Sequence, residues 1–271
     1  MNRLLRVLLS LNSLRKTLGF VNFFSATKFN HHIEEIKDPN FQNVLVLSPH
    51  PDDDVFGLGG TLAKISKKKA TITVAYFCDG AGGVRIENEN RDLRDIGIDI
   101  KKDKSLIEKR KVEAKEAGKI LGIGSQVFFG YPDNELASGS AAVRALVDLI
   151  NKVEPVIIFT PSFLDNHPDH RVTNEILMNA LSEYKYQDNV QIWAYEVWTP
   201  LYPNRLVPIK EVLEIKKEAI KKHQSQLEAR DYLGAIVGLN QYRAEINNID
   251  GFAEAFFATT NKIYRDLYKK S

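Results

Sequence analysis

Hydrophobic and polar positions form two kinds of alternating segment from residue 43 onward. Short apolar runs predict buried strands at Val44–Leu47, Thr71–Phe77, Gln126–Phe129, Val156–Phe159 and Gln191–Val197. Longer stretches with helical spacing of apolar residues lie near residues 55–67, 105–121, 140–153 and 171–184. Residues 200–271 predict further helical segments that complete the domain. This alternation predicts an α/β fold with a mostly parallel sheet and helices on both faces.

The first 38 residues differ from the rest and predict an N-terminal extension before a single α/β domain over residues 39–271. Within residues 1–25, leucines and a valine recur at helical spacing and basic residues lie elsewhere around the helix, which indicates a basic amphipathic helix. Arg6, Asn12 and Arg15 interrupt the apolar residues well short of the roughly 18 that a membrane span needs. Three roles stay open: packing or oligomer contact, peripheral membrane contact, and targeting.

Composition narrows the class of protein. Of 271 residues, 44% are apolar, which is enough for a sizeable core. Five basic residues precede the first acidic residue, Glu34, so removing them from the formal charge of +2 leaves −3 for the remainder. That balance gives no electrostatic case for nucleic-acid binding. The single cysteine, Cys78, excludes an internal disulfide framework and favours a reducing, cytoplasmic location; we expect a buried thiol there.

The first candidate site follows the strand at Val44–Leu47 and reads His50-Pro51-Asp52-Asp53-Asp54. Because Pro51 fixes φ where a helix begins, His50 and Asp53 can converge on one point with Asp52 beside them. An imidazole and a carboxylate at one point suggest zinc. The alternative, a carboxylate that only caps the helix, needs one acid rather than three. The glycines at 57, 59 and 60 lack phosphate-loop spacing and predict close packing of the helix on the sheet.

The second candidate site follows the strand ending at Phe159 and reads Asp165-Asn166-His167-Pro168-Asp169-His170. Two histidines three residues apart can point into one pocket, and only one of them need bind a metal. Ligands bind beyond the carboxyl ends of strands in parallel sheets, so we expect both motifs at one site.

Other residues with polar or aromatic chemistry are interpreted as structural. His31 and His32 are expected at the surface, and His223 at a solvated helix end. Tyr195, Trp198 and Tyr202 can stack on a sugar, but core packing is favoured. The polar stretch from 79 to 104 is expected to be an active-site loop.

Taken together, these motifs resemble the PIG-L/LmbE family of zinc-dependent N-deacetylases. The resemblance covers roughly residues 43–230 and rests on Ser48-Pro49-His50-Pro51-Asp52-Asp53-Asp54, Gly59-Gly60-Thr61, Arg110-x-x-Glu113 and Asp165-x-His167-Pro168-Asp169-His170-Arg171. It implies a Rossmann-like sheet, a zinc ion, and removal of acetyl from an N-acetylglucosamine-type conjugate. Where the family usually has glutamate, this chain has Asp54, which keeps the charge and shortens its reach.

The resemblance also implies a metal site and catalytic roles. His50, Asp53 and His170 are the implied zinc ligands, and iron is the alternative metal. Asp52 is the implied general base. His167 would polarise the carbonyl and, when protonated, stabilise the oxyanion, with Asp169 orienting it. Either His167 or Asp52 can protonate the departing amine.

Substrate contacts rest on fewer residues. Arg110 and Arg85 can meet an anionic part of a small N-acetyl amino-sugar conjugate, and Asp133 can contact sugar hydroxyls. An ion pair between Arg110 and Glu113, or a simple turn at Asp133, would explain the same residues structurally. Two other functions stay open, a zinc amidase acting on a non-sugar amide and a catalytically silent sugar-binding protein. By resemblance we also expect a homo-oligomer.

Overall fold

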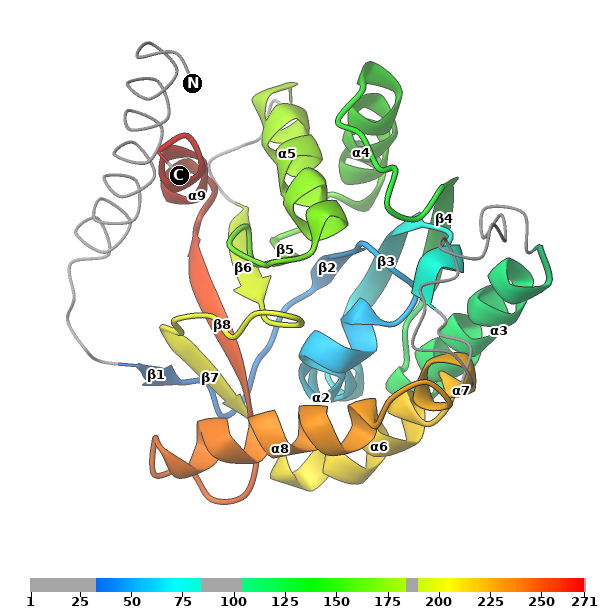
Figure 1. The fold of residues 1–271 in the computed structure, drawn as a ribbon. Coiled ribbons are helices and arrows are strands. Elements are labelled where there is room, and N and C mark those ends of the chain that lie inside the picture. The colour runs from blue at the N-terminus through cyan, green and yellow to red at the C-terminus, as the bar shows by residue number, and fades with distance from the viewer. Residues whose placement is uncertain (1–32, 84–103, 184–189, 271) are drawn as a thin grey trace, which may run out of the picture.

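Eight strands form one mixed sheet in the computed structural model, which describes residues 33–83, 104–183 and 190–270 (Figure 1). The strands are β1 (Glu34–Glu35), β2 (Asn43–Ser48), β3 (Thr71–Cys78), β4 (Ser125–Tyr131), β5 (Ile157–Pro161), β6 (Gln191–Tyr195), β7 (Arg205–Pro208) and β8 (Ala253–Thr260). Their order is β1-β7-β8-β6-β5-β2-β3-β4. Strand β8 runs antiparallel to β6 and β7, and the other pairs are parallel.

Helices cover both faces of the sheet. They are α2 (Asp53–Lys67), α3 (Lys104–Leu121), α4 (Ser140–Val153), α5 (Pro168–Glu183), α6 (Leu213–Ile220), α7 (Gln224–Leu227), α8 (Tyr232–Glu245) and α9 (Asn261–Tyr268), with 3₁₀ turns at Ala81–Gly83 and Lys210–Val212. In Figure 1, α4, α5 and α9 lie above the sheet and α2, α3, α6 and α8 below it. Two large hydrophobic cores result, one on each face, beside a small cluster around Leu206, and alternate residues of β2 such as Val44 and Leu45 contribute to opposite large cores.

The predicted α/β architecture is confirmed. The five apolar runs form β2 to β6, and the four periodic stretches form α2 to α5. The prediction for residues 200–271 was wrong in part, because β7 and β8 lie there as well as helices. Strand β8 lies in the sheet between β7 and β6, although both of these strands come well before it in the sequence.

The order of the strands in the sheet changes direction at β2. From β2 the chain passes to β3 and then β4 in one direction, and β5 follows on the other side of β2. The loops after β2 and β5 therefore diverge at the same edge, which is where open α/β sheets bind ligands. His50 directly follows β2, and α5 begins at Pro168 after β5.

The glycines of α2 allow close packing, as predicted. A Cβ on Gly57 would lie 2.3 Å from the Tyr195 ring, and one on Gly60 would lie 2.6 Å from Ile209. These two positions hold the helix against β6 and the segment after β7.

Some predictions concern residues outside the described ranges. These are the amphipathic helix within residues 1–25, most of the extension, surface positions for His31 and His32, and Arg85 with most of its loop. The division into residues 1–38 and 39–271 stays a prediction. Among the described helices, none combines the length and apolarity needed to cross a membrane.

Candidate active site

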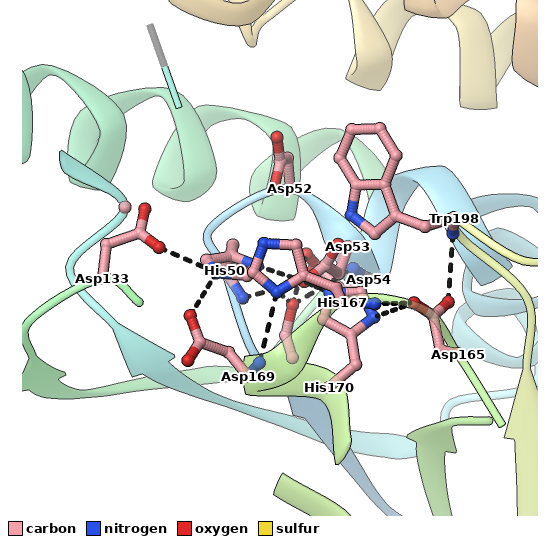
Figure 2. Close-up of polar contacts among 12 residues, drawn as sticks. His50, Asp52, Asp53, Asp54, Asp133, Asp165, His167, Asp169, His170 and Trp198 are labelled. Carbon is pink, nitrogen blue, oxygen red and sulfur yellow. Dashed lines mark hydrogen bonds and ion pairs between the residues drawn. The ribbon is translucent and has the colours of Figure 1, made fainter. Parts of the chain in front are cut away.

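Three histidines meet where β2 and β5 end. The ring centroids of His50 and His167 lie 4.6 Å apart, those of His167 and His170 5.0 Å, and those of His50 and His170 5.5 Å. One ring nitrogen from each lies within 4.8 Å of the others (Figure 2). The expectation that both motifs share one site therefore agrees with the structure.

The carboxylate of Asp53 lies between two of these rings. Its Oδ2 is 3.1 Å from His50 Nδ1 and 3.2 Å from His170 Nε2, and it accepts the backbone N–H of His50 at 2.8 Å. Burial alone would raise the pKa of Asp53, but the contacts with His170 and His50 hold it well below its usual range. Asp53 is thus ionised and points at the same space as the two imidazoles.

Two further carboxylates contact the far nitrogen of His50. Its Nε2 lies 3.2 Å from Asp133 Oδ1 and 3.2 Å from Asp169 Oδ2. Burial lowers the pKa of His50, yet the contacts with Asp133, Asp169 and Asp53 outweigh it and raise the pKa well above its ordinary value. Asp169 also accepts the backbone N–H of Asn134 at 2.9 Å, which ties the loop after β4 to α5.

The carboxylate of Asp169 was predicted to orient His167, and its contact is with His50 instead. Only the backbone N–H of Asp169 reaches His167, donating to Nδ1 at 3.2 Å. That bond requires Nδ1 to be unprotonated, so the ring proton is on Nε2. Burial, together with the charges of His50 and His170, lowers the pKa of His167. The structure therefore favours a neutral His167 over the predicted imidazolium.

The acid beside His170 is Asp165. Its Oδ1 lies 3.5 Å from His170 Nδ1 and accepts the backbone N–H of His167 at 2.9 Å. Burial lowers the pKa of His170, but Asp53 and Asp165 raise it overall to about 9. Asp165 therefore sets the orientation of one imidazole and the path of the loop carrying the other.

Asp52 lies against Arg110. Its Oδ2 is 3.0 Å from an Arg110 guanidinium nitrogen, and another nitrogen of Arg110 donates to the Gly80 carbonyl at 2.5 Å. Burial raises the pKa of Asp52, and Arg110 opposes that shift. The alternative pairing of Arg110 with Glu113 is not what the structure has, because Glu113 accepts two hydrogen bonds from Ser225.

Asp54 points away from the histidines, into the protein. It accepts the Tyr76 hydroxyl at 3.0 Å, and its backbone N–H donates to the Ser48 hydroxyl at 3.2 Å. Burial raises the pKa of Asp54 to about 7, against the lowering effect of the Tyr76 bond. The short side chain of Asp54 therefore has a hydrogen-bond donor in the Tyr76 hydroxyl.

The aromatic residues near β6 divide into two groups. Tyr195 is fully buried and donates to the Leu47 carbonyl at 2.7 Å, so core packing is confirmed for it. The same prediction was wrong for Trp198 and Tyr202, which are 43% and 47% exposed. Both follow the end of β6 in a loop at the active edge, where burial cannot be read from local hydrophobicity.

Two other predictions are now decided. Cys78 is a buried thiol, as expected. His223 is not at a solvated helix end: it is fully buried, and among the described residues neither ring nitrogen has a hydrogen-bond partner. Its neighbour Ser225 bonds to Glu113 of α3, which draws this turn inward.

The donor set fits a divalent metal of borderline softness. Imidazole nitrogens and carboxylate oxygens suit zinc and iron(II), and the described site supplies both. In the described part of the chain neither buried ring nitrogen of His170 has a hydrogen bond of good geometry, and Nε2, which faces Asp53, is available as a ligand. Five nearly buried carboxylates surround the histidines and Arg110, and a divalent cation would offset that excess of negative charge. They are Asp52, Asp53, Asp133, Asp165 and Asp169.

Known proteins share this sequence pattern and fold. The family model PIG-L, described as GlcNAc-PI de-N-acetylase, matches residues 45–181. A diacetylchitobiose deacetylase of Thermococcus kodakarensis is 26% identical over 216 residues, covering 73% of each chain. A probable N-acetyl-alpha-D-glucosaminyl L-malate deacetylase 2 of Bacillus anthracis is 28% identical over 69% of this chain and 82% of its own.

The fold comparison agrees with the sequence comparison. The N,N'-diacetylchitobiose deacetylase of Pyrococcus horikoshii, solved with an inhibitor, superposes with a TM-score of 0.70 at 23% identity, covering 83% of this chain and 86% of that one. The family match spans half of the chain and includes every strand end and helix start that carries the histidine motifs. On that evidence, the chain belongs to the PIG-L family of N-deacetylases.

Proposed function

We propose that this protein is a zinc-dependent hydrolase that removes the acetyl group from an N-acetylglucosamine-type conjugate, releasing acetate and a free amine. The observation that carries the proposal is the Asp53 carboxylate between the imidazoles of His50 and His170, with Asp52 beside it. The two relatives named above, which by name act on diacetylchitobiose and on a glucosaminyl malate, support this substrate class.

His50, Asp53 and His170 would hold the metal, and iron(II) suits the same ligands. When bound, the ion supplies a Lewis acid that polarises the amide carbonyl and lowers the pKa of a water molecule. Asp165 and Asp169 support the two imidazoles through the contacts described above.

Asp52 would act as the general base. It accepts a proton from the attacking water, which requires the ionised carboxylate, and the adjacent guanidinium of Arg110 favours that form. A positioned base of this kind typically contributes about 10²–10⁴-fold in rate. Protonated Asp52 could then return the proton to the departing amine; the alternative donor, His167, would have to be protonated to supply one.

His167 would stabilise the charge that develops on the amide oxygen. Because its Nδ1 accepts a backbone hydrogen bond, Nε2–H is the group free to donate toward the substrate. A donor aimed at a developing oxyanion is worth about 3 kcal/mol in a site shielded from water. A neutral imidazole is sufficient for this role, because its Nε2–H is the donor.

Asp133 and Arg110 would contact the sugar part of the substrate, with Arg85 as a further candidate. Asp133 accepts the backbone N–H of Gly82 at 2.9 Å, and Gly82 is three residues before Arg85 in the sequence. We also propose a homo-oligomer and peripheral membrane contact through residues 1–25, to be tested by sedimentation and liposome flotation.

The test is release of free amine from a panel of N-acetylglucosamine conjugates. Metal-free protein is assayed before and after addition of zinc or iron(II), alongside Asp52→Asn. Asp250→Asn is the control, because that side chain is 85% exposed and lies on a distant turn. We expect metal-dependent turnover that falls about 10²–10⁴-fold in Asp52→Asn and is unchanged in the control.

Other outcomes would favour the alternatives. Turnover of simple N-acetyl amides but of no sugar conjugate would favour a non-sugar amidase. Tight metal binding without turnover of either would favour a binding protein. Absence of metal binding would refute the assignment of His50, Asp53 and His170 as ligands.

A further inference from the structure

Trp198 exposes part of a large apolar side chain next to the histidine site. It is 43% exposed, whereas the only other tryptophan, Trp193, is 4% exposed and packs against Phe159 and Phe256. Exposed aromatic surface next to a cluster of polar side chains is a common mark of ligand binding.

The indole is positioned beside a residue of the proposed reaction. Its ring centroid lies 6.4 Å from that of His167, with the planes inclined by only 27°. The ring of Tyr232 of α8 lies 5.8 Å from the indole, with the two planes at 79°. In Figure 2 the indole and the Asp52 carboxylate both project to the same side of the histidine group.

The loop that carries Trp198 is fixed to the site. Asp165 Oδ2 accepts the backbone N–H groups of Trp198 and Thr199, at 3.1 and 3.3 Å, and the Thr199 hydroxyl accepts the N–H of Asn166 at 2.9 Å. Asp165 is the same carboxylate that contacts His170. The position of the indole is therefore coupled to the histidine loop.

The base of the loop is closed by a buried ion pair. Glu196 accepts from Arg243 at 2.6 Å and from the backbone N–H of Leu201 at 3.0 Å. Arg243 in turn donates to the Leu201 carbonyl at 2.7 Å. Such a loop is ordered before a ligand arrives, which reduces the entropic cost of binding.

We propose that Trp198 is a specificity-determining residue whose exposed indole face stacks on the pyranose ring that bears the N-acetyl group. This inference rests on the proposed function. One face of a pyranose presents C–H groups, which pack on an aromatic ring, while its hydroxyls point outward to polar groups such as Asp133. Trp198 thereby selects cyclic sugar amides over acyclic amides with the same functional groups.

The first test compares a ring with its open form. Initial rates are measured on the methyl glycoside of N-acetylglucosamine and on N-acetylglucosaminitol, which keeps the hydroxyls and the amide but lacks the ring. In Trp198→Ala we expect KM for the glycoside to rise about tenfold, with kcat within about twofold, and KM for the open form to stay unchanged. Trp198→Phe keeps an aromatic face and should retain most of the affinity.

The control is Tyr242→Ala, which removes an exposed aromatic side chain on α8. This variant should leave KM and kcat unchanged for both substrates. Equal losses on the ring and the open form in Trp198→Ala would mean a structural effect on the His167 loop and would overturn the inference. Unchanged KM on both would overturn it too.

A second test needs no turnover. Acrylamide quenching of tryptophan fluorescence is measured in metal-free protein with and without the glycoside. We expect the sugar to protect the exposed Trp198, with the effect lost in Trp198→Phe. If the wild-type protein fails to turn over any sugar conjugate, the proposed function fails, while protection would still support Trp198 as a sugar contact and its absence would refute that.

Discussion

Glu254 offers a quantitative test of how α2, which carries Asp53, is held in place. The helix is kinked at Leu58, where φ is −144° and ψ is 19°. Beyond the kink, the backbone N–H groups of Gly60 and Thr61 donate to the Glu254 carboxylate of β8, at 2.8 and 2.7 Å. The carboxylate therefore acts as an N-terminal cap supplied by a distant strand.

The charge of this cap is balanced by one buried lysine. Lys216 Nζ lies 2.6 Å from Glu254 Oε1 and donates to Asn240 Oδ1 at 2.9 Å, and both charged side chains are fully buried. Removing one partner of a buried ion pair typically costs about 3–5 kcal/mol, because the other charge is left uncompensated. We expect that loss for Glu254→Gln, whose remaining amide oxygen can still accept one of the helix N–H groups.

Urea unfolding of the metal-free protein at pH 7 measures this loss. The double variant Glu254→Gln with Lys216→Met removes both charges and should recover part of the stability, to within about 2 kcal/mol of wild type. Asp250→Asn, which breaks an exposed pair with Lys210, is the control and should not change the midpoint. A loss below about 1 kcal/mol for Glu254→Gln, or strict additivity in the double variant, would refute the reasoning.

Three further predictions follow from other buried groups. Burial lowers the pKa of His223 to about 3, so the free energy of unfolding of the wild-type protein should fall by about 1.4 kcal/mol per pH unit between pH 6.5 and 3. Urea unfolding at pH 7 and 4.5 should show that His223→Gln lacks this component. The same pH dependence in both proteins would contradict this. Gly57→Ala would force a Cβ against the Tyr195 ring and should lower the free energy of unfolding by about 1–3 kcal/mol, measured by thermal unfolding. Gly124→Ala should not, because the nearest atom to a Cβ at that position is 3.5 Å away. Burial raises the pKa of Cys78 to about 12, so iodoacetamide at pH 8 should label it only after unfolding; rapid labelling of the native protein would show that the thiol is accessible.

The sequence predicted those parts of the fold whose signal is local. The strand β2 is apolar at four consecutive positions because helices cover both faces, and this short continuous apolar run predicts a buried strand without a structure. Strand β8 has no comparable signal: it begins Ala253-Glu254, and the glutamate faces a helix 194 residues away in sequence. A carboxylate within a strand argues against burial unless its partners are known. Neither the burial of β8 nor the cap on α2 could therefore be predicted from the local sequence.

His223 was misread for a similar reason. It lies in a run of lysine and glutamine residues, which predicts a solvated helix end. Instead, Glu113 of α3 bonds to both the backbone N–H and the hydroxyl of Ser225, and His223 packs beside Phe56. The Arg-x-x-Glu pattern thus has two separate uses, with Arg110 directed to Asp52 and Glu113 to this turn.

The candidate site shows which chemistry a sequence can predict and which it cannot. Residue type and strand order are enough to bring His50 together with His167 and His170, because the ends of neighbouring parallel strands must meet at one edge. The partner of each imidazole depends instead on how three loops pass one another. Asp169 contacts His50, Asp165 contacts His170, and neither assignment follows from spacing, since both acids lie within four residues of His167. The proton position on His167 depends in turn on the backbone N–H of Asp169, which donates to Nδ1 and so leaves the ring proton on Nε2.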